Sequence, residues 1–101
     1  MDIVKENSED GIVLKLSGKL DTNTAPELEK AITELFVSEE LKNLELDMAG
    51  VTYLSSAGLR VLLATQKKIN TLKGQLVITN ASKTLKEVFE ITGFMGILTI
   101  A

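Results

Sequence analysis

Hydrophobic and polar residues alternate in short stretches of this chain, as they do in half-buried β-strands. The alternation is seen at 12–17, where Ile12, Leu14 and Leu16 alternate with Val13, Lys15 and Ser17. A polar segment at 7–11 separates the first two alternating stretches and is typical of a hairpin loop. The pattern predicts strands at 3–6, 11–18, 44–48, 75–79 and 97–100.

Apolar residues recur at helical spacing in three further stretches. Thr24 and Glu27 have the spacing of a capping box and predict the start of the first helix. The second helix is predicted over 56–73, after a short loop that follows the strand at 44–48. Ser82 is placed to cap a third helix that ends at Gly93.

The order of the predicted elements is β-β-α-β-α-β-α-β. This order predicts an α/β fold, with a mixed β-sheet and helices packed against it. The chain has 101 residues, of which 45% are apolar and 25% charged. Such a length and composition suit one folded domain with one core, so we expect a single domain over 1–101.

Composition removes several classes of function. The chain has no cysteine and no histidine, so it lacks disulfides, thiolate chemistry and the usual zinc ligands, and it cannot form a Ser-His-Asp triad. The acidic residues Asp2, Asp10 and Asp47 have no ligand-like spacing, so we expect neither a metal nor a cofactor. The chemistry of the chain therefore favours a binding domain over an enzyme.

Charge and hydropathy narrow the classes of partner that the chain could bind. The net charge is −3 and Arg60 is the single arginine, so nucleic acid is a poor partner. The first ten residues are acidic and polar, unlike a signal peptide, and no apolar run approaches the roughly 20 residues that span a bilayer. We expect a cytoplasmic protein with no membrane contact.

Two adjacent serines, Ser55 and Ser56, stand where the predicted second helix begins. The start of a helix has free N–H groups and a partial positive charge. A serine at this position caps the helix in the simplest interpretation, and it can equally carry a phosphate that the same N–H groups stabilise. The small residues Ala57 and Gly58 are expected to leave room for a partner to approach.

Two segments resemble motifs of the STAS domain family, and within it the stand-alone bacterial anti-sigma factor antagonists. The first is SGKLD at 17–21, where the family usually shows G-[DE]-[LI]-D. The second is 47–63, centred on YLSSAGL, where the family usually shows [DS]-S-[SA]-G-[LI]. The resemblance covers essentially the whole chain. Lys19 and Ser55 depart from it, because both positions are usually acidic in the family.

The resemblance implies a single STAS domain that works by partner switching. The unphosphorylated antagonist would bind an anti-sigma factor that is also a serine kinase of the GHKL type, and so release a sigma factor. The kinase would then phosphorylate the antagonist, and a phosphatase of the PP2C type would reset it. Residue by residue, the phosphoacceptor falls on Ser56, with Ser55 as the second choice.

The predicted partner surface is the start of the second helix together with the loop after the second strand. Its residues are Asp21, Thr22, Ser55, Ser56, Ala57, Gly58, Leu59 and Arg60. We expect the protein to act as a monomer. Two alternatives stay open: a STAS scaffold or small-ligand sensor that is never phosphorylated, and a nucleotide-hydrolysing enzyme, which the absence of a phosphate-loop lysine and of histidine disfavours.

Overall fold

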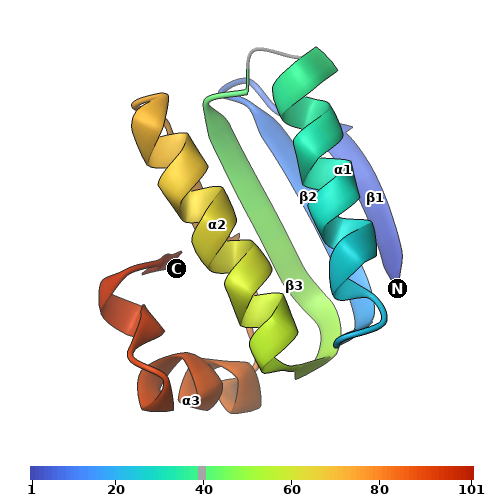
Figure 1. Cartoon of the computed structure of the whole chain (residues 1–101), viewed down its shortest axis with the longest axis vertical. Helices are drawn as coiled ribbons and strands as arrows, with labels where there is room; N and C mark the ends of the chain where they lie inside the picture. Colours follow the sequence, from blue (N-terminus) through green and yellow to red (C-terminus); the bar gives the residue numbers. More distant parts are fainter. Residues whose placement is uncertain (39–40) are drawn as a thin grey trace.

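The computed structural model describes residues 1–38 and 41–101. Its five strands form one sheet in the order β1-β2-β3-β4-β5, in which β1 is antiparallel to β2 and the other neighbours are parallel. Figure 1 shows β1, β2 and β3 side by side. The mixed sheet and the element order predicted from the sequence are confirmed. The elements are β1 (Asp2–Asn7), β2 (Ile12–Leu20), α1 (Ala25–Ser38), β3 (Asn43–Leu54), α2 (Ser56–Thr71), β4 (Gln75–Thr79), α3 (Lys83–Ile91), the 3₁₀ helix η1 (Phe94–Gly96) and β5 (Thr99–Ile100).

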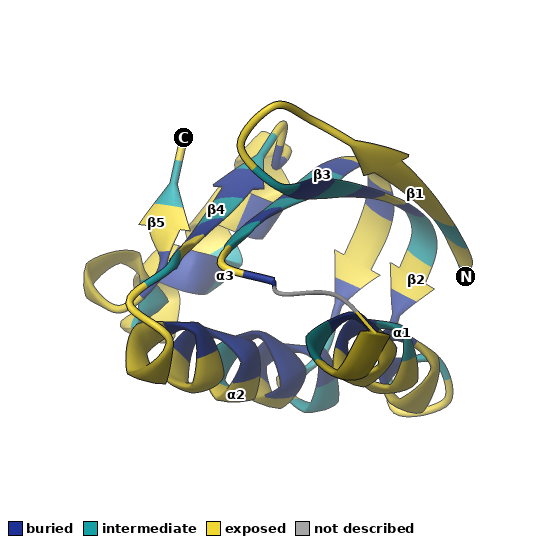
Figure 2. Cartoon of the chain, turned by 90° about the horizontal axis from the view of Figure 1, so that it is seen from above, coloured by how far each residue is buried: buried dark blue, intermediate teal, exposed yellow. Residues whose placement is uncertain are grey.

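Helices α1 and α2 lie side by side across one face of the sheet (Figures 1 and 2). Their buried sides face the strands, and their outer sides are exposed (Figure 2). The core between the two layers is almost wholly aliphatic. Fully buried members include Leu14, Leu20, Leu28, Leu44, Leu46, Met48, Leu62 and Ile69. This layer fixes the ends of β2 and β3 relative to the start of α2.

The other face of the sheet carries polar side chains that bond across the strands. The Thr79 hydroxyl donates to Glu45 Oε2 at 2.9 Å, and the Asn80 amide donates to Asp47 Oδ1 at 3.0 Å. The Asn80 bond is the largest of the effects that hold the pKa of Asp47 below its ordinary value of 3.8. Alternation of buried and polar positions, which predicted the strands, therefore reflects one covered face and one open face.

Strand β3 is longer than the sequence pattern predicts. We expected a strand at 44–48 followed by a short loop, and that expectation is wrong, because β3 continues to Leu54 and leads straight into Ser55. Its second half pairs with β2 across register shifts, which change the spacing of buried positions. Gly50 allows this pairing, since a Cβ there would lie 2.6 Å from Ser17 Cβ.

The predicted helix starts hold, with one difference in detail. Ser82 caps α3 by accepting a hydrogen bond from the Leu85 N–H at 3.2 Å, as predicted. Thr24 does not form the predicted capping box, because its hydroxyl bonds to the preceding loop: it accepts from the Asp21 N–H at 2.9 Å and donates to the Lys19 carbonyl at 2.6 Å. The predicted last strand is reduced to Thr99–Ile100, because the Ile97 and Leu98 N–H groups both donate to the Phe94 carbonyl and so form a turn after η1.

Candidate functional site

The two serines have different environments. Ser55 is the N-cap of α2: its backbone is extended, and its hydroxyl accepts a long hydrogen bond, 3.4 Å, from the Gly58 N–H. The Ser55 N–H donates to the Leu20 carbonyl at 2.9 Å, which ties the cap to the end of β2. Capping therefore falls to Ser55, the first of the pair.

Ser56 is the first residue of α2, and its side chain is exposed. In the described part of the chain, its hydroxyl makes no hydrogen bond. The first turn of α2 contains no acidic residue, so nothing there offsets the partial positive charge of the helix start. A phosphate on Ser56 would meet free backbone N–H groups and a favourable dipole.

Gly58 and Leu59 lie beneath the site and do not form its surface. Both are buried, and a Cβ on Gly58 would lie 2.6 Å from Leu20 Cγ and 2.9 Å from Leu54 Cδ1. Our expectation that Gly58 leaves room for a partner is therefore wrong, because the missing side chain serves a close internal approach. These residues set the position of Ser56 from below.

Asp21 organises the loop between β2 and α1. Its carboxylate accepts hydrogen bonds from the Asn23 N–H at 2.9 Å and from the Thr24 N–H at 3.1 Å. Loss of solvation acts to raise the pKa of Asp21, but these bonds, the Thr24 hydroxyl and the charge of Lys19 hold that pKa below its ordinary value of 3.8. The Asp21 carboxylate thus has a built-in structural use in shaping the turn.

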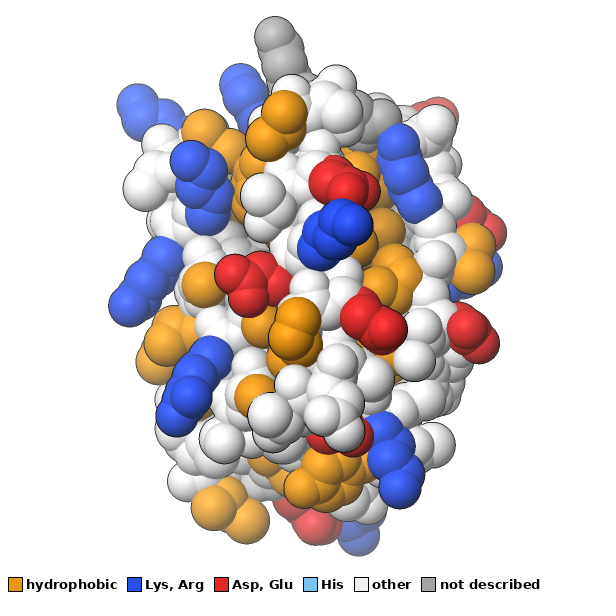
Figure 3. Space-filling view, turned by 45° about the vertical axis from the view of Figure 1, so that its right-hand side comes forward, with side chains coloured by type: hydrophobic (Ala, Val, Ile, Leu, Met, Phe, Trp, Pro, Cys, Tyr) orange, Lys and Arg blue, Asp and Glu red, His pale blue; other side chains and the backbone are white. Residues whose placement is uncertain are grey.

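A shallow pocket of about 350 Å³ brings part of the predicted surface together. Thr22 from the loop meets Ala57 and Arg60 from the first turns of α2, and the start of α1 supplies most of the remaining wall. Asp21, Ser55 and Ser56 are not among its lining residues. Figure 3, which looks onto the side with α1, shows basic side chains along the left edge and a mixture of basic and acidic side chains in the middle and to the right. The pocket therefore brings the loop after β2 and the first turns of α2 together, and we call this surface, at Thr22, Ala57 and Arg60, the rim.

Tyr53 is an exposed residue two positions before Ser55 that the predicted surface did not include. Its side chain is 51% exposed, and it stands opposite Lys19 in the register of β2 and β3. The available signal in the sequence was a tyrosine two residues before Ser55, since tyrosine is enriched at protein interfaces.

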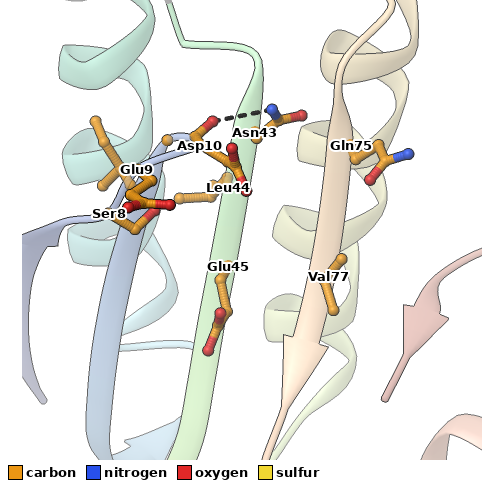
Figure 4. Close-up of a pocket in the computed structure, with 10 residues that line it drawn as sticks. Ser8, Glu9, Asp10, Asn43, Leu44, Glu45, Gln75 and Val77 are labelled. Carbon is orange, nitrogen blue, oxygen red and sulfur yellow. Dashed lines mark hydrogen bonds between the residues drawn. The ribbon is translucent and has the colours of Figure 1, made fainter.

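A second hollow of about 510 Å³ lies at the opposite end of the strands, between the β1–β2 hairpin and the starts of β3 and β4 (Figure 4). The Asn43 amide crosses it to donate to the Asp10 carbonyl at 2.9 Å. Within 1–38 and 41–101, no three His, Cys, Asp or Glu residues are grouped to hold a metal ion. Among the same residues, no helix is long and apolar enough to cross a membrane.

Fold and site together define a small α/β domain with an exposed serine at a helix start. The STAS domain family matches residues 2–101, so the chain belongs to that family. It is 33% identical to the anti-sigma-B factor antagonist of Listeria monocytogenes, over 96% of this chain and 84% of that one.

Several solved structures have a similar fold. An anti-sigma factor antagonist from Mycobacterium paratuberculosis matches with a TM-score of 0.87 and 26% identity, covering 98% of this chain and 83% of that one. Unphosphorylated SpoIIAA matches with a TM-score of 0.78 and 16% identity, over 99% of this chain and 87% of that one. SpoIIAA of Bacillus in its phosphorylated form matches with a TM-score of 0.76 and 18% identity, over 99% of this chain and 91% of that one. At these identities the SpoIIAA likeness concerns the fold.

Proposed function

We propose that this protein is an anti-sigma factor antagonist that is switched off by phosphorylation of Ser56. In its unphosphorylated form it binds an anti-sigma factor and so releases a sigma factor. The observation that carries the proposal is the division of labour between the serines: Ser55 caps α2, while the Ser56 hydroxyl is exposed and unbonded among the described residues. The name of the Listeria relative supports the antagonist role.

The proposed switch acts at the partner interface and leaves the domain folded. A phosphate adds about −1.5 to −2 charges at pH 7. At the start of α2 the helix dipole favours that charge, so the isolated domain tolerates it. At an interface the same charge must be desolvated and repels acidic groups, and each 1.4 kcal/mol of lost binding free energy is about a tenfold loss of affinity.

The proposed partners are an anti-sigma factor that is also a GHKL-type serine kinase, and a PP2C-type phosphatase. The antagonist supplies a substrate hydroxyl and a docking surface, and the chemistry is done by these two proteins in the cytoplasm. Its surface comprises Asp21, Thr22, Ser55, Ser56, Ala57 and Arg60, with Tyr53 added. Gly58 and Leu59 support that surface from the core.

Phosphopeptide mapping tests the proposal. The protein is incubated with ATP and each candidate serine kinase of its cell, beside the variants Ser56→Ala and Ser55→Ala. We expect label on the peptide that contains 53–60, lost in Ser56→Ala and retained in Ser55→Ala. Absence of label from that peptide with every kinase would overturn the proposal and favour an unphosphorylated scaffold or ligand sensor.

A further inference from the structure

Arg60 lies one helical turn after Ser56 on α2. Residues four apart on a helix are neighbours on its surface, and the two positions are about 6 Å apart along the axis. Both side chains are exposed, so neither is held in the core. The spacing places the guanidinium within reach of any group attached to the Ser56 hydroxyl.

Arg60 has no partner of its own in the described part of the chain. No ion pair or hydrogen bond of its guanidinium is present there, although Glu29 lines the same pocket from α1. A cation in the first turns of a helix is also mildly unfavourable, because it faces the positive end of the dipole. An unpaired arginine in this position is therefore poised to gain from an added anion.

We propose that Arg60 is the intramolecular partner of the phosphate on Ser56, an inference that rests on the proposed function. The planar guanidinium can donate two parallel hydrogen bonds to phosphate oxygens. A lysine ammonium group attracts the phosphate as a point charge and lacks this paired geometry. Phosphorylation then changes the rim twice. It adds a dianion, and it withdraws the one positive charge that, among the described residues, lines the pocket with Thr22 and Ala57.

Other charged groups approach the same rim from the neighbouring elements. Lys19 is the second-last residue of β2, Asp21 lies in the following loop, and Glu29 lines the pocket from α1. Their effect on a Ser56 phosphate is common to the wild type and to any Arg60 variant. A comparison between these proteins therefore isolates the contribution of Arg60.

The test is a ³¹P NMR titration of protein that carries phosphoserine at position 56, installed during translation so that no kinase is needed. We expect the second pKa of the phosphate to be about half a unit higher in Arg60→Gln than in the wild type. Arg60→Lys should bring the second pKa of the phosphate most of the way back to its wild-type value. Lys67→Gln, an exposed cation further along α2, is the matched control and should leave the pKa unchanged.

Thermal unfolding gives a second readout. The Tm is measured for the wild type and for Arg60→Gln, each with and without the phosphate, which forms a double-mutant cycle. The phosphate should raise the Tm more in the wild type than in Arg60→Gln. Equal phosphate pKa values in the wild type and Arg60→Gln, or an equal shift in Lys67→Gln, would overturn the role of Arg60. Because the phosphate is installed without a kinase, this failure is distinct from failure of the mapping experiment.

Discussion

Gly58 offers the sharpest test of how the site is held. In Gly58→Ala the new Cβ would lie 2.6 Å from Leu20 Cγ, 2.9 Å from Leu54 Cδ1 and 3.0 Å from Leu20 Cδ2. The atom at 2.6 Å is the branch point of Leu20, a side chain that is fully buried, so it has little freedom to move aside. The first turn of α2 must therefore shift away from the ends of β2 and β3.

The expected magnitude follows from two opposing effects. Overpacking of a core costs about 1–3 kcal/mol. Replacing a helical glycine by alanine returns up to about 1 kcal/mol of helix propensity. We expect a net loss of about 1–2 kcal/mol in the free energy of unfolding, which lowers the Tm of a domain of this size by roughly 4–16 °C.

Urea and thermal unfolding, followed by circular dichroism, measure this loss. The matched control is Gly96→Ala, where a new Cβ meets no atom within 4 Å and where the backbone has no positive φ. The control should be neutral or slightly stabilising. A Gly58→Ala variant as stable as Gly96→Ala would refute the close approach of α2 to Leu20 and Leu54.

Three further predictions concern the rim itself. Ser55→Ala should lower the free energy of unfolding by about 0.5 kcal/mol, the low end for an N-cap because its bond is long at 3.4 Å, as urea denaturation would show. The Asp21 carboxyl should titrate below 3.8 by NMR. Since its folded pKa is lowered, its stabilising effect relative to Asp21→Asn should be constant above the unfolded pKa and fade as the pH falls through the folded pKa. Tyr53→Ala should weaken binding of the anti-sigma factor at least tenfold with an unchanged Tm, measured by calorimetry and thermal unfolding.

Each of these three has a contradicting result. A loss above 2 kcal/mol for Ser55→Ala would mean that the serine does more than cap α2. A midpoint for Asp21 above 3.8 would contradict the hydrogen bonds drawn to its carboxylate. Equal affinity of Tyr53→Ala and the wild type would remove Tyr53 from the surface, and a fall in Tm would assign it a structural role.

Local features of the fold could be predicted from the sequence where the signal is local. The bounds of β4 at 75–79 and the cap at Ser82 follow from alternation and from cap chemistry within a few residues. The second half of β3 could not be predicted this way. Its pairing with β2 contains register shifts, and these break the alternation on which the prediction depends.

The site likewise has features that the local sequence shows and features that depend on residues distant in the chain. Two serines at a helix start are visible in the sequence, and their motif favours Ser56. The burial of Gly58 depends on Leu20, which is distant in sequence, so the spacing of residues around Gly58 does not reveal it. The division of roles between Ser55 and Ser56 likewise depends on the exact residue at which α2 begins. Sequence patterns locate the end of a helix only to within about one or two residues.

The central claim is that a phosphate on Ser56 separates this protein from its anti-sigma factor. The most direct measurement is isothermal titration calorimetry of that factor, identified as the kinase that labels Ser56, with unphosphorylated protein and with protein carrying phosphoserine at position 56. We predict tight binding of the first and an affinity at least tenfold lower for the second, at least about 1.4 kcal/mol. Equal affinities, with both forms folded, would contradict the account.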